Sequence, residues 1–348
     1  MAYSSILKPS DYFNPNIYTG TGSSNSQTGL GFQPDWTWIK SRSNTYSNVL
    51  IDAVRGVGTT ISSNSGNAAY SSPTEITSFD SDGFTLGTDA GVNNNASTFV
   101  SWNWKANGAG SANTDGSINT DATSVNTTAG FSICKWTGTG SNATIGHGLG
   151  VAPKMIIVKN VSTSDSWNVY HESIGNGERL FLDTTGAQSS TSDAWNSTSP
   201  TSSVFSIGTN TGTNGSGNTL IAYCFAEKVG YSKFKNYVGN GSTNGTFTYT
   251  GFKPAFVMVK YASPGGGVGN WGIFDSARNP ANIVDKGLLA NTNAVEDTSD
   301  FIDILSNGFK QRSASSNRNE NGSTYVYMAF AEHPFVANVD GGLPTTAR

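Results

Sequence analysis

Three similar apolar stretches organise this chain. Each starts at a proline and ends at a lysine: PDWTWIK at residues 34–40, PKMIIVK at 153–159 and PAFVMVK at 254–260. The copies lie about 100 to 120 residues apart, which is the size of a domain rather than of a solenoid repeat. The sequence therefore indicates one module that occurs three times.

Two further landmarks recur in the same order around each of these stretches. A glycine-rich turn precedes the proline: YTGTG at 18–22, WTGTG at 136–140 and YVGNG at 237–241. An aromatic strand closes each module: FVSWNWKA at 99–106, LIAYCFAE at 220–227 and YVYMAFAE at 325–332. This agreement supports the assignment of a repeat.

Composition predicts the fold class. The chain has 41 glycines among 348 residues and only 13% charged residues, against about a quarter in ordinary domains. Its apolar runs are short, rich in β-branched and aromatic residues, and separated by Gly, Asn, Ser and Thr clusters, which is the pattern of β-strands and turns. We expect an all-β protein of three tandem antiparallel β-sandwich modules, of the jelly-roll or lectin-like kind.

The repeat also predicts domain boundaries. We place module 1 at residues 1–108, module 2 at 130–232 and module 3 at 233–348. Residues 109–129 are rich in Gly, Ser, Thr and Asn, and we expect a linker or exposed loop there. Because module 2 runs almost directly into module 3, we expect these two to be rigidly coupled and module 1 to be looser.

Several classes of function are disfavoured by what the sequence lacks. A net charge of −4 without a Lys/Arg block is unlike a nucleic-acid-binding protein. The first residues do not resemble a secretory signal, and no apolar run reaches about 18 residues, so we expect synthesis in a cytoplasm and no membrane insertion. Cys134 and Cys224 are expected to be buried free thiols rather than a disulfide.

Catalytic and metal-binding patterns are weak, so we expect no enzyme, no catalytic residues, no metal and no cofactor. The histidines are scattered without metal-site spacing: His147, His171 and His333. Asp80 and Asp82 could bind calcium but first of all form a turn sequence. A polysaccharide depolymerase needs two converging carboxylates, and the candidate acids show no recognisable motif: Glu172, Glu178 and Glu227.

Eight tryptophans, with polar loops between them, favour a carbohydrate-binding surface. Trp167 and Trp271 recur at one repeat position, which is typical of core packing. The predicted glycan-binding residues are Trp195, Asn196 and Trp36, since aromatic rings stack on sugar faces beside amide groups that bond sugar hydroxyls.

Several motifs together resemble a known family. They are KPSDYFN at 8–14, GFQPDWTWIK at 31–40, SDGFTLG at 81–87, IGHGLG at 145–150 and YCFAE at 223–227. The chain is similar over nearly its whole length, to residue 348, to uncharacterised-domain proteins of tailed phages of marine and aquatic bacteria. The resemblance implies a virion structural protein with concanavalin-like or jelly-roll modules, tail-fibre-like in kind; it supplies no site residues.

These observations predict a surface protein of a phage particle, located on the virion after synthesis in the host. Its leading role is attachment to a host-surface glycan as a tail-associated protein; the alternative is a capsid decoration protein that stabilises the head. Expected partners are other virion structural proteins and a host glycan. Exposed strand edges that need cover favour a homotrimer.

Overall fold

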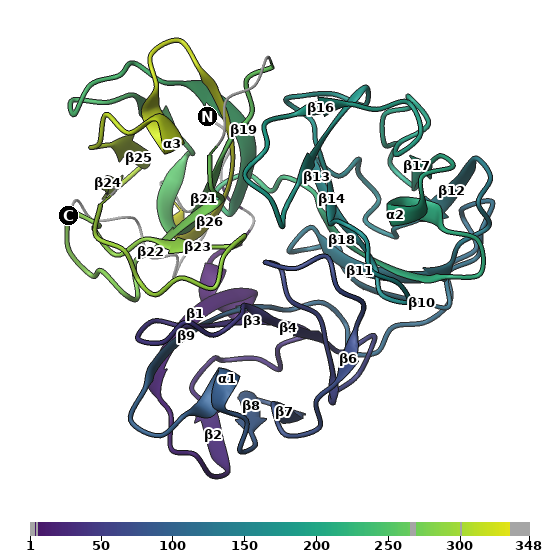
Figure 1. Ribbon diagram of the computed structural model, residues 1–348, viewed down its shortest axis with the longest axis horizontal. Helices are drawn as coiled ribbons and strands as arrows, with labels where there is room; N and C mark the ends of the chain where they lie inside the picture. The colour runs from purple at the N-terminus through teal and green to yellow at the C-terminus, as the bar shows by residue number, and fades with distance from the viewer. Residues whose placement is uncertain (1–3, 5, 265–268, 300, 335–348) are drawn as a thin grey trace.

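The computed structural model describes residues 4, 6–264, 269–299 and 301–334. The predicted all-β fold of antiparallel sheets is confirmed. Figure 1 shows three modules in a triangle around a common centre, with the chain running from module 1 through module 2 to module 3. The predicted end of module 3 at residue 348 lies outside the described residues.

Each module contains one large sheet, and the central strand order is the same in all three. In module 1 the order is β1 (Phe13–Thr19), β9 (Thr98–Trp104), β3 (Trp36–Ser41) and β4 (Val49–Asp52). In module 2 it is β11 (Phe131–Thr137), β18 (Thr219–Phe225), β13 (Met155–Asn160) and β14 (Asn168–His171). In module 3 it is β19 (Ser232–Val238), β26 (Thr324–Pro334), β21 (Phe252–Tyr261) and β22 (Gly272–Asp275).

Short strands extend these sheets at their edges. Module 2 gains β10 (Ala122–Asn126) beside β11, and β15 (Glu178–Phe181) and β16 (Ser189–Ser190) beyond β14; module 3 gains β23 (Leu288–Leu289) beyond β22. A separate pair in module 1 joins β5 (Thr59–Thr60) to β6 (Tyr70–Ser71).

A smaller sheet covers one face of each large sheet and makes the sandwich. Its strands are β2 (Asn25–Thr28), β8 (Gly83–Leu86) and β7 (Ile76–Asp80) in module 1, β12 (Ala143–Gly146) and β17 (Val204–Ile207) in module 2, and β20 (Phe247–Tyr249), β25 (Gly308–Gln311) and β24 (Ile302–Leu305) in module 3. The helices are single turns: η1 (Pro9–Asp11), α1 (Ala90–Asn93), α2 (Thr211–Asn214) and α3 (Ser316–Asn319).

The proline-led strands are apolar throughout because both of their faces are buried. Side chains of a strand point alternately to opposite faces. In β3, Ile39 faces the sandwich core of module 1, whereas Trp36 and Trp38 face a second core at the centre of the molecule. Residues of β13 and β21 divide in the same way between their own module and this central core.

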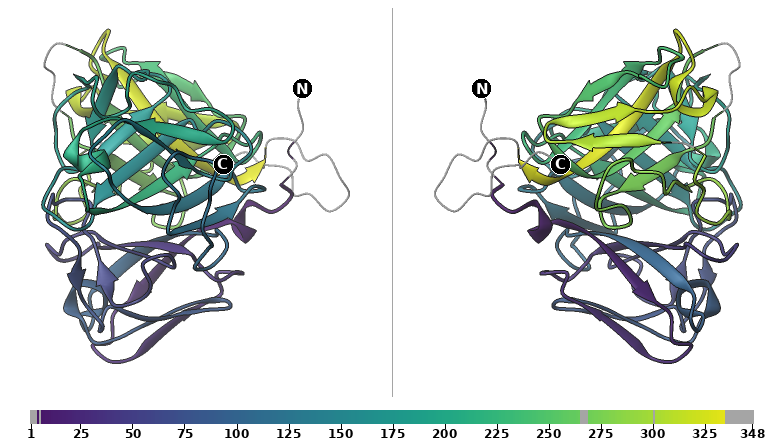
Figure 2. Two further views of the ribbon diagram at one scale, coloured as in Figure 1. Left: turned by 90° about the vertical axis from the view of Figure 1, so that its right-hand side faces the viewer. Right: turned by 90° about the vertical axis from the view of Figure 1, so that its left-hand side faces the viewer.

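The central core joins all three modules, so the expectation of a looser module 1 is wrong. The ring of Trp36 stacks on Tyr223 of module 2 with centroids 4.2 Å apart. Phe13 stacks on Phe330 of module 3 at 4.9 Å. Figure 2 shows from the side that module 1 lies directly against the other two. Burial of this shared apolar surface stabilises the three modules as one body.

Residues 109–129 also differ from the expected linker or exposed loop. Ala122–Asn126 forms β10 and pairs antiparallel with β11. Ahead of it, Ile118 makes a bridge to Ile145 of β12. A polar segment thus becomes part of module 2, because its backbone groups pair with the edges of both sheets there. Within the described residues, none of the helices is long and apolar enough to cross a membrane.

Candidate functional site

The predicted glycan-binding tryptophans do not form a surface platform. Trp36 is 1% exposed in the central core, and Trp195 is 2% exposed in the core of module 2. An indole buries a large apolar area, and the central core holds Trp36 while the sandwich interior of module 2 holds Trp195. Trp167 and Trp271 are buried, as predicted. Asn196 is half-buried, with left-handed backbone at φ 48°, and its glycan role stays a prediction.

Other residues that the sequence singled out serve local structure. Asp82 accepts hydrogen bonds from the backbone N–H groups of Gly29 (3.0 Å) and Gly31 (2.6 Å), which ties the turn down. His147 Nδ1 accepts from Leu149 N–H, and burial lowers the pKa of this imidazole. No cluster of three or more metal-ligating side chains occurs in the described part of the chain. Cys134 and Cys224 are buried free thiols, as predicted.

Buried lysines at the ends of the three proline-led strands join the modules. Each ammonium, of Lys40, Lys159 and Lys260, lies among backbone carbonyls of its own module and of a neighbouring one. Lys40 Nζ donates to Asn293 O of module 3 (3.2 Å). Lys159 Nζ donates to Gly66 O of module 1 (3.0 Å).

The third lysine closes the ring of contacts. Lys260 Nζ donates to Thr185 O of module 2 at 2.8 Å, so each module donates one lysine to a different neighbour. Burial lowers the pKa of Lys40 and of Lys159 to about 8 and that of Lys260 to about 7. An ammonium has three donors, and three carbonyls satisfy them. These lysines act as polar clamps in otherwise apolar interfaces.

A second ring of polar contacts lies one strand further on. Asp52 of module 1 accepts a hydrogen bond from the hydroxyl of Tyr223 of module 2 (2.7 Å). Asp275 of module 3 accepts from the indole N–H of Trp102 of module 1 (3.0 Å). His171 of module 2 lies with Nε2 3.2 Å from the carbonyl of Tyr327 of module 3.

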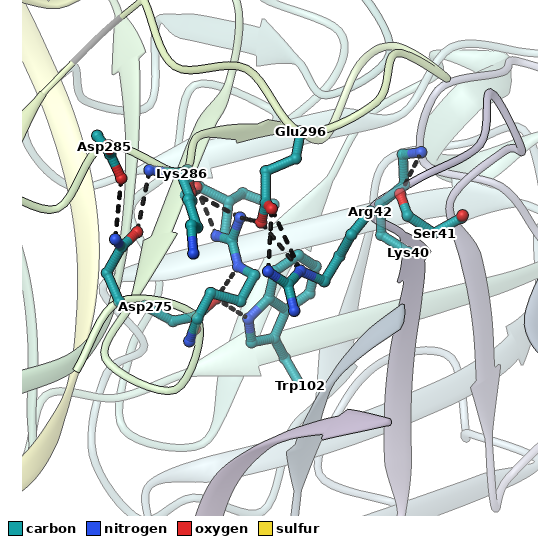
Figure 3. Close-up of polar contacts among 11 residues, drawn as sticks. Lys40, Ser41, Arg42, Trp102, Asp275, Asp285, Lys286 and Glu296 are labelled. Carbon is teal, nitrogen blue, oxygen red and sulfur yellow. Dashed lines mark hydrogen bonds and ion pairs between the residues drawn. The ribbon is translucent and has the colours of Figure 1, made fainter. Parts of the chain in front are cut away.

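The interface between modules 1 and 3 adds a chain of charges. Figure 3 shows Glu296 between Arg42 and the site of Asp275 and Trp102. Arg42 Nη2 lies 3.0 Å from Glu296 Oε2, and Arg278 Nη1 lies 3.0 Å from Glu296 Oε1. The other side of the Arg278 guanidinium pairs with Asp275, with Nε and Oδ2 2.6 Å apart. Paired charges of this kind hold one relative orientation of two modules, because both partners are hydrogen-bonded.

Three asparagines that sequence reasoning missed anchor the glycine-rich turns. Asn93, Asn214 and Asn319 end the helices α1, α2 and α3 and are fully buried. Asn93 Oδ1 accepts from the backbone N–H of Thr21 (2.9 Å), and its amide donates to Gly87 O (2.6 Å). An alignment of residues 89–95, 210–216 and 315–321 places asparagine fifth in every copy, and this signal could have found them.

One surface groove lies between β19 and β20 of module 3. Its volume is about 290 Å³, and it is lined by Lys233, Lys235, Asn236, Tyr237, Phe247, Thr248, Tyr249 and Tyr327. Phe247 and Tyr249 are 44% and 54% exposed. Exposed aromatic rings thus lie there beside lysines, an amide and a hydroxyl.

The fold and these sites define an all-β protein of three interlocked sandwich modules whose conspicuous polar groups hold the modules together. The chain belongs to a family whose model is described as a domain of unknown function (DUF7483) and matches residues 8–334. Searches of curated proteins and of solved structures find no match.

Proposed function

We propose that the protein is a structural component on the surface of a tailed-bacteriophage particle, where it serves as a tail-associated protein for attachment to host-surface glycans. The observation that carries this proposal is the arrangement of three corresponding modules around one centre. A single chain with this arrangement offers three similar faces to partners related by a threefold axis, and cyclic symmetry is common in protein assemblies.

The chemistry of the interior supports a structural role. The lysine clamps and the buried Asp–Arg pairs satisfy their groups within the chain. The carboxylates considered for glycoside cleavage are engaged too. Glu172 pairs with Lys154 and Lys235, Glu227 pairs with Lys233, and Glu178 accepts a hydrogen bond from the Ser190 hydroxyl. These contacts favour a scaffold over a depolymerase.

Capsid decoration is the second candidate, and the same threefold arrangement favours it, since a decoration protein clamps neighbouring subunits. Gold-labelled antibody against the protein, applied to intact particles and imaged by electron microscopy, tests both. Label at the tail supports attachment. Label spread over the head overturns attachment and supports decoration, and particles without label overturn the virion proposal itself.

The predicted homotrimer belongs to the same proposal. Three modules in one chain already form the arrangement that a trimer of single modules would form. Mass measurement of the purified protein by light scattering, at concentrations from micromolar upward, distinguishes one chain of 36.5 kDa from three. A monomer at every concentration would overturn the homotrimer and leave the surface role to be tested on particles.

A further inference from the structure

The groove between β19 and β20 contains a departure from the repeat. The strand pairs β2–β8, β12–β17 and β20–β25 can be aligned on the buried phenylalanine in the second strand of each pair. In this alignment Gln27, Ile145 and Thr248 occupy the same position, each opposite its phenylalanine. The neighbours of Gln27 and Ile145 are small or polar, whereas those of Thr248 are Phe247 and Tyr249. The two exposed rings are therefore not part of the packing that the modules share.

Module 2 fills the equivalent groove with its own chain. There β10 pairs with β11 along the edge of the large sheet, and Ile118 N–H donates to Thr144 O at the edge of the small sheet (3.1 Å). Ile118 and Val125 pack against the sandwich core of this module. An extended segment thus closes the open side of the sandwich by adding to both sheet edges.

Module 1 closes its groove with side chains. Asn16 Nδ2 donates to Gln27 Oε1 across the gap between β1 and β2 (3.2 Å). Asn14 Nδ2 donates to the carbonyl of Leu30 (3.1 Å). In both sister modules, then, the two sheet edges are joined, once by a strand and once by amide contacts.

The groove of module 3 contains no added strand among the described residues, and a side-chain contact joins its two edges at one end, where Thr246 Oγ1 donates to the carbonyl of Val238 (2.7 Å). β19 and β20 are the terminal strands of their sheets there. The register positions of Asn14 and Asn16 hold Lys233 and Lys235, which pair with acids outside the groove, Glu227 and Glu172. Thr248 is 6% exposed, and its hydroxyl has no hydrogen-bond partner in the described part of the chain. A buried hydroxyl without a partner carries a free-energy cost.

We propose that this groove binds an extended peptide segment of another polypeptide, which adds as a strand to β19 and takes the place that residues 118–126 occupy in module 2. This goes beyond the proposed function and does not rest on it. Unpaired sheet edges bind strands through backbone hydrogen bonds, and pockets for alternate side chains supply specificity. The partner segment carries β-branched residues at alternate positions, as Thr123 and Val125 do in β10, and its flanks contact Phe247 and Tyr249.

One backbone group makes the proposal testable. In module 2 the carbonyl of Lys135 accepts from Asp121 N–H of the added segment (2.8 Å), so the backbone of Lys135 faces the groove. Asn236 has the same register position in β19, and both polar groups of a residue in an antiparallel strand point to one side. Asn236→Pro removes the N–H that would meet the peptide, and proline is tolerated at such an edge position.

The experiment measures binding of the full chain to an array of 12-residue peptides that alternate Ile or Val with Thr or Ser, together with a peptide of residues 115–126 of this chain. We expect a subset to bind and Asn236→Pro to weaken this binding about tenfold or more. Ile17→Pro is the matched control, because Ile17 has the same register position in module 1, where the groove is closed; it should leave binding unchanged.

Two results would overturn the proposal. One is that no peptide of the array binds; the other is that bound peptides are insensitive to Asn236→Pro. A polysaccharide that binds and is lost on Tyr249→Ala, while peptides fail to bind, would show that the groove takes a glycan instead. Circular dichroism and unfolding midpoints of the two proline variants verify that both remain folded.

Discussion

Modules 1 and 3 differ from module 2 at one buried position. As the last residue of β4 and of β22, modules 1 and 3 have Asp52 and Asp275, whereas β14 of module 2 ends at His171. Each acid pairs with an arginine three residues later, and in module 2 that place holds Ile174. Yet all three side chains hydrogen-bond a residue of a neighbouring module.

The difference shows that the arrangement of modules demands a polar contact at this place but does not dictate its chemistry. A carboxylate needs a cation beside it, because an unpaired buried charge is costly. Burial lowers the pKa of His171 to about 4, so the imidazole is neutral at pH 7. The backbone N–H of Ser173 and the carbonyl of Tyr327 serve its two nitrogens without a charged partner.

The largest expected effect on stability comes from breaking a buried pair of aspartate and arginine. Asp52→Ala leaves Arg55 buried without its carboxylate, and we expect the free energy of unfolding to fall by about 3–5 kcal/mol, measured by urea unfolding. The double variant Asp52→Ala/Arg55→Met is the control and should lose clearly less, because no charge remains unpaired. Equal losses in the two variants would show that the unpaired charge of Arg55 does not cause the destabilisation.

The contact made by the neutral imidazole of His171 is expected to stabilise the protein less at acidic pH. The native pKa of His171 lies below the ordinary value of 6.5, so the unfolded state binds the proton first as pH falls. The contribution of His171 to the free energy of unfolding is complete above about pH 6.5 and is lost as the pH falls towards 4. The loss is about 3 kcal/mol, because each pH unit of this window costs about 1.4 kcal/mol. His171→Gln should flatten the dependence of the unfolding free energy on pH across this window. An unchanged slope would assign the acid sensitivity to other groups.

Removing a donor rather than a charge should cost less. Tyr223→Phe deletes the hydroxyl that donates to Asp52 across modules 1 and 2, and we expect a loss of about 2 kcal/mol, as for hydrogen bonds to charged groups. Tyr231→Phe is matched to it, since the Tyr231 hydroxyl is buried and has no hydrogen-bond partner among the described residues. Thermal unfolding should show little or no loss for the second variant; a similar loss in both would contradict the assignment.

The smallest effect is expected where an ion pair between modules is exposed. The carboxylate of Glu172 of module 2 lies 3.2 Å from the ammonium of Lys235 of module 3. Both side chains are more than a third exposed. Lys235→Met removes this pair and leaves the pair of Glu172 with Lys154 in place, and it should lower the unfolding free energy by less than about 1 kcal/mol. The loss should shrink further in 1 M NaCl. A loss as large as that of Asp52→Ala would mean that surface charge holds the modules together.

Much of the fold could be predicted from the repeated strands. The alternation in β3 between Trp and Thr or Ile follows from two buried faces, and the recurrence of Trp167 and Trp271 at one repeat position indicates core packing from the sequence alone. The glycan assignment of Trp36 and Trp195 was wrong, because composition reports that indoles are present and not which of them are covered. The terminal lysines of the repeat were visible as well, but their burial depends on the neighbouring module.

By itself the sequence indicated three copies of one module, the order of the recurring landmarks along the chain and the apolar character of the strands, since these depend on local periodicity and on residues aligned between copies. The tertiary structure alone decided which module each lysine reaches and which groove stays open. The lysines bind backbone carbonyls, which every residue type supplies, so no side-chain pattern marks the partner. The three grooves lie at equivalent positions of the repeated module. Only the path of residues 109–126 distinguishes the groove of module 2, which these residues fill.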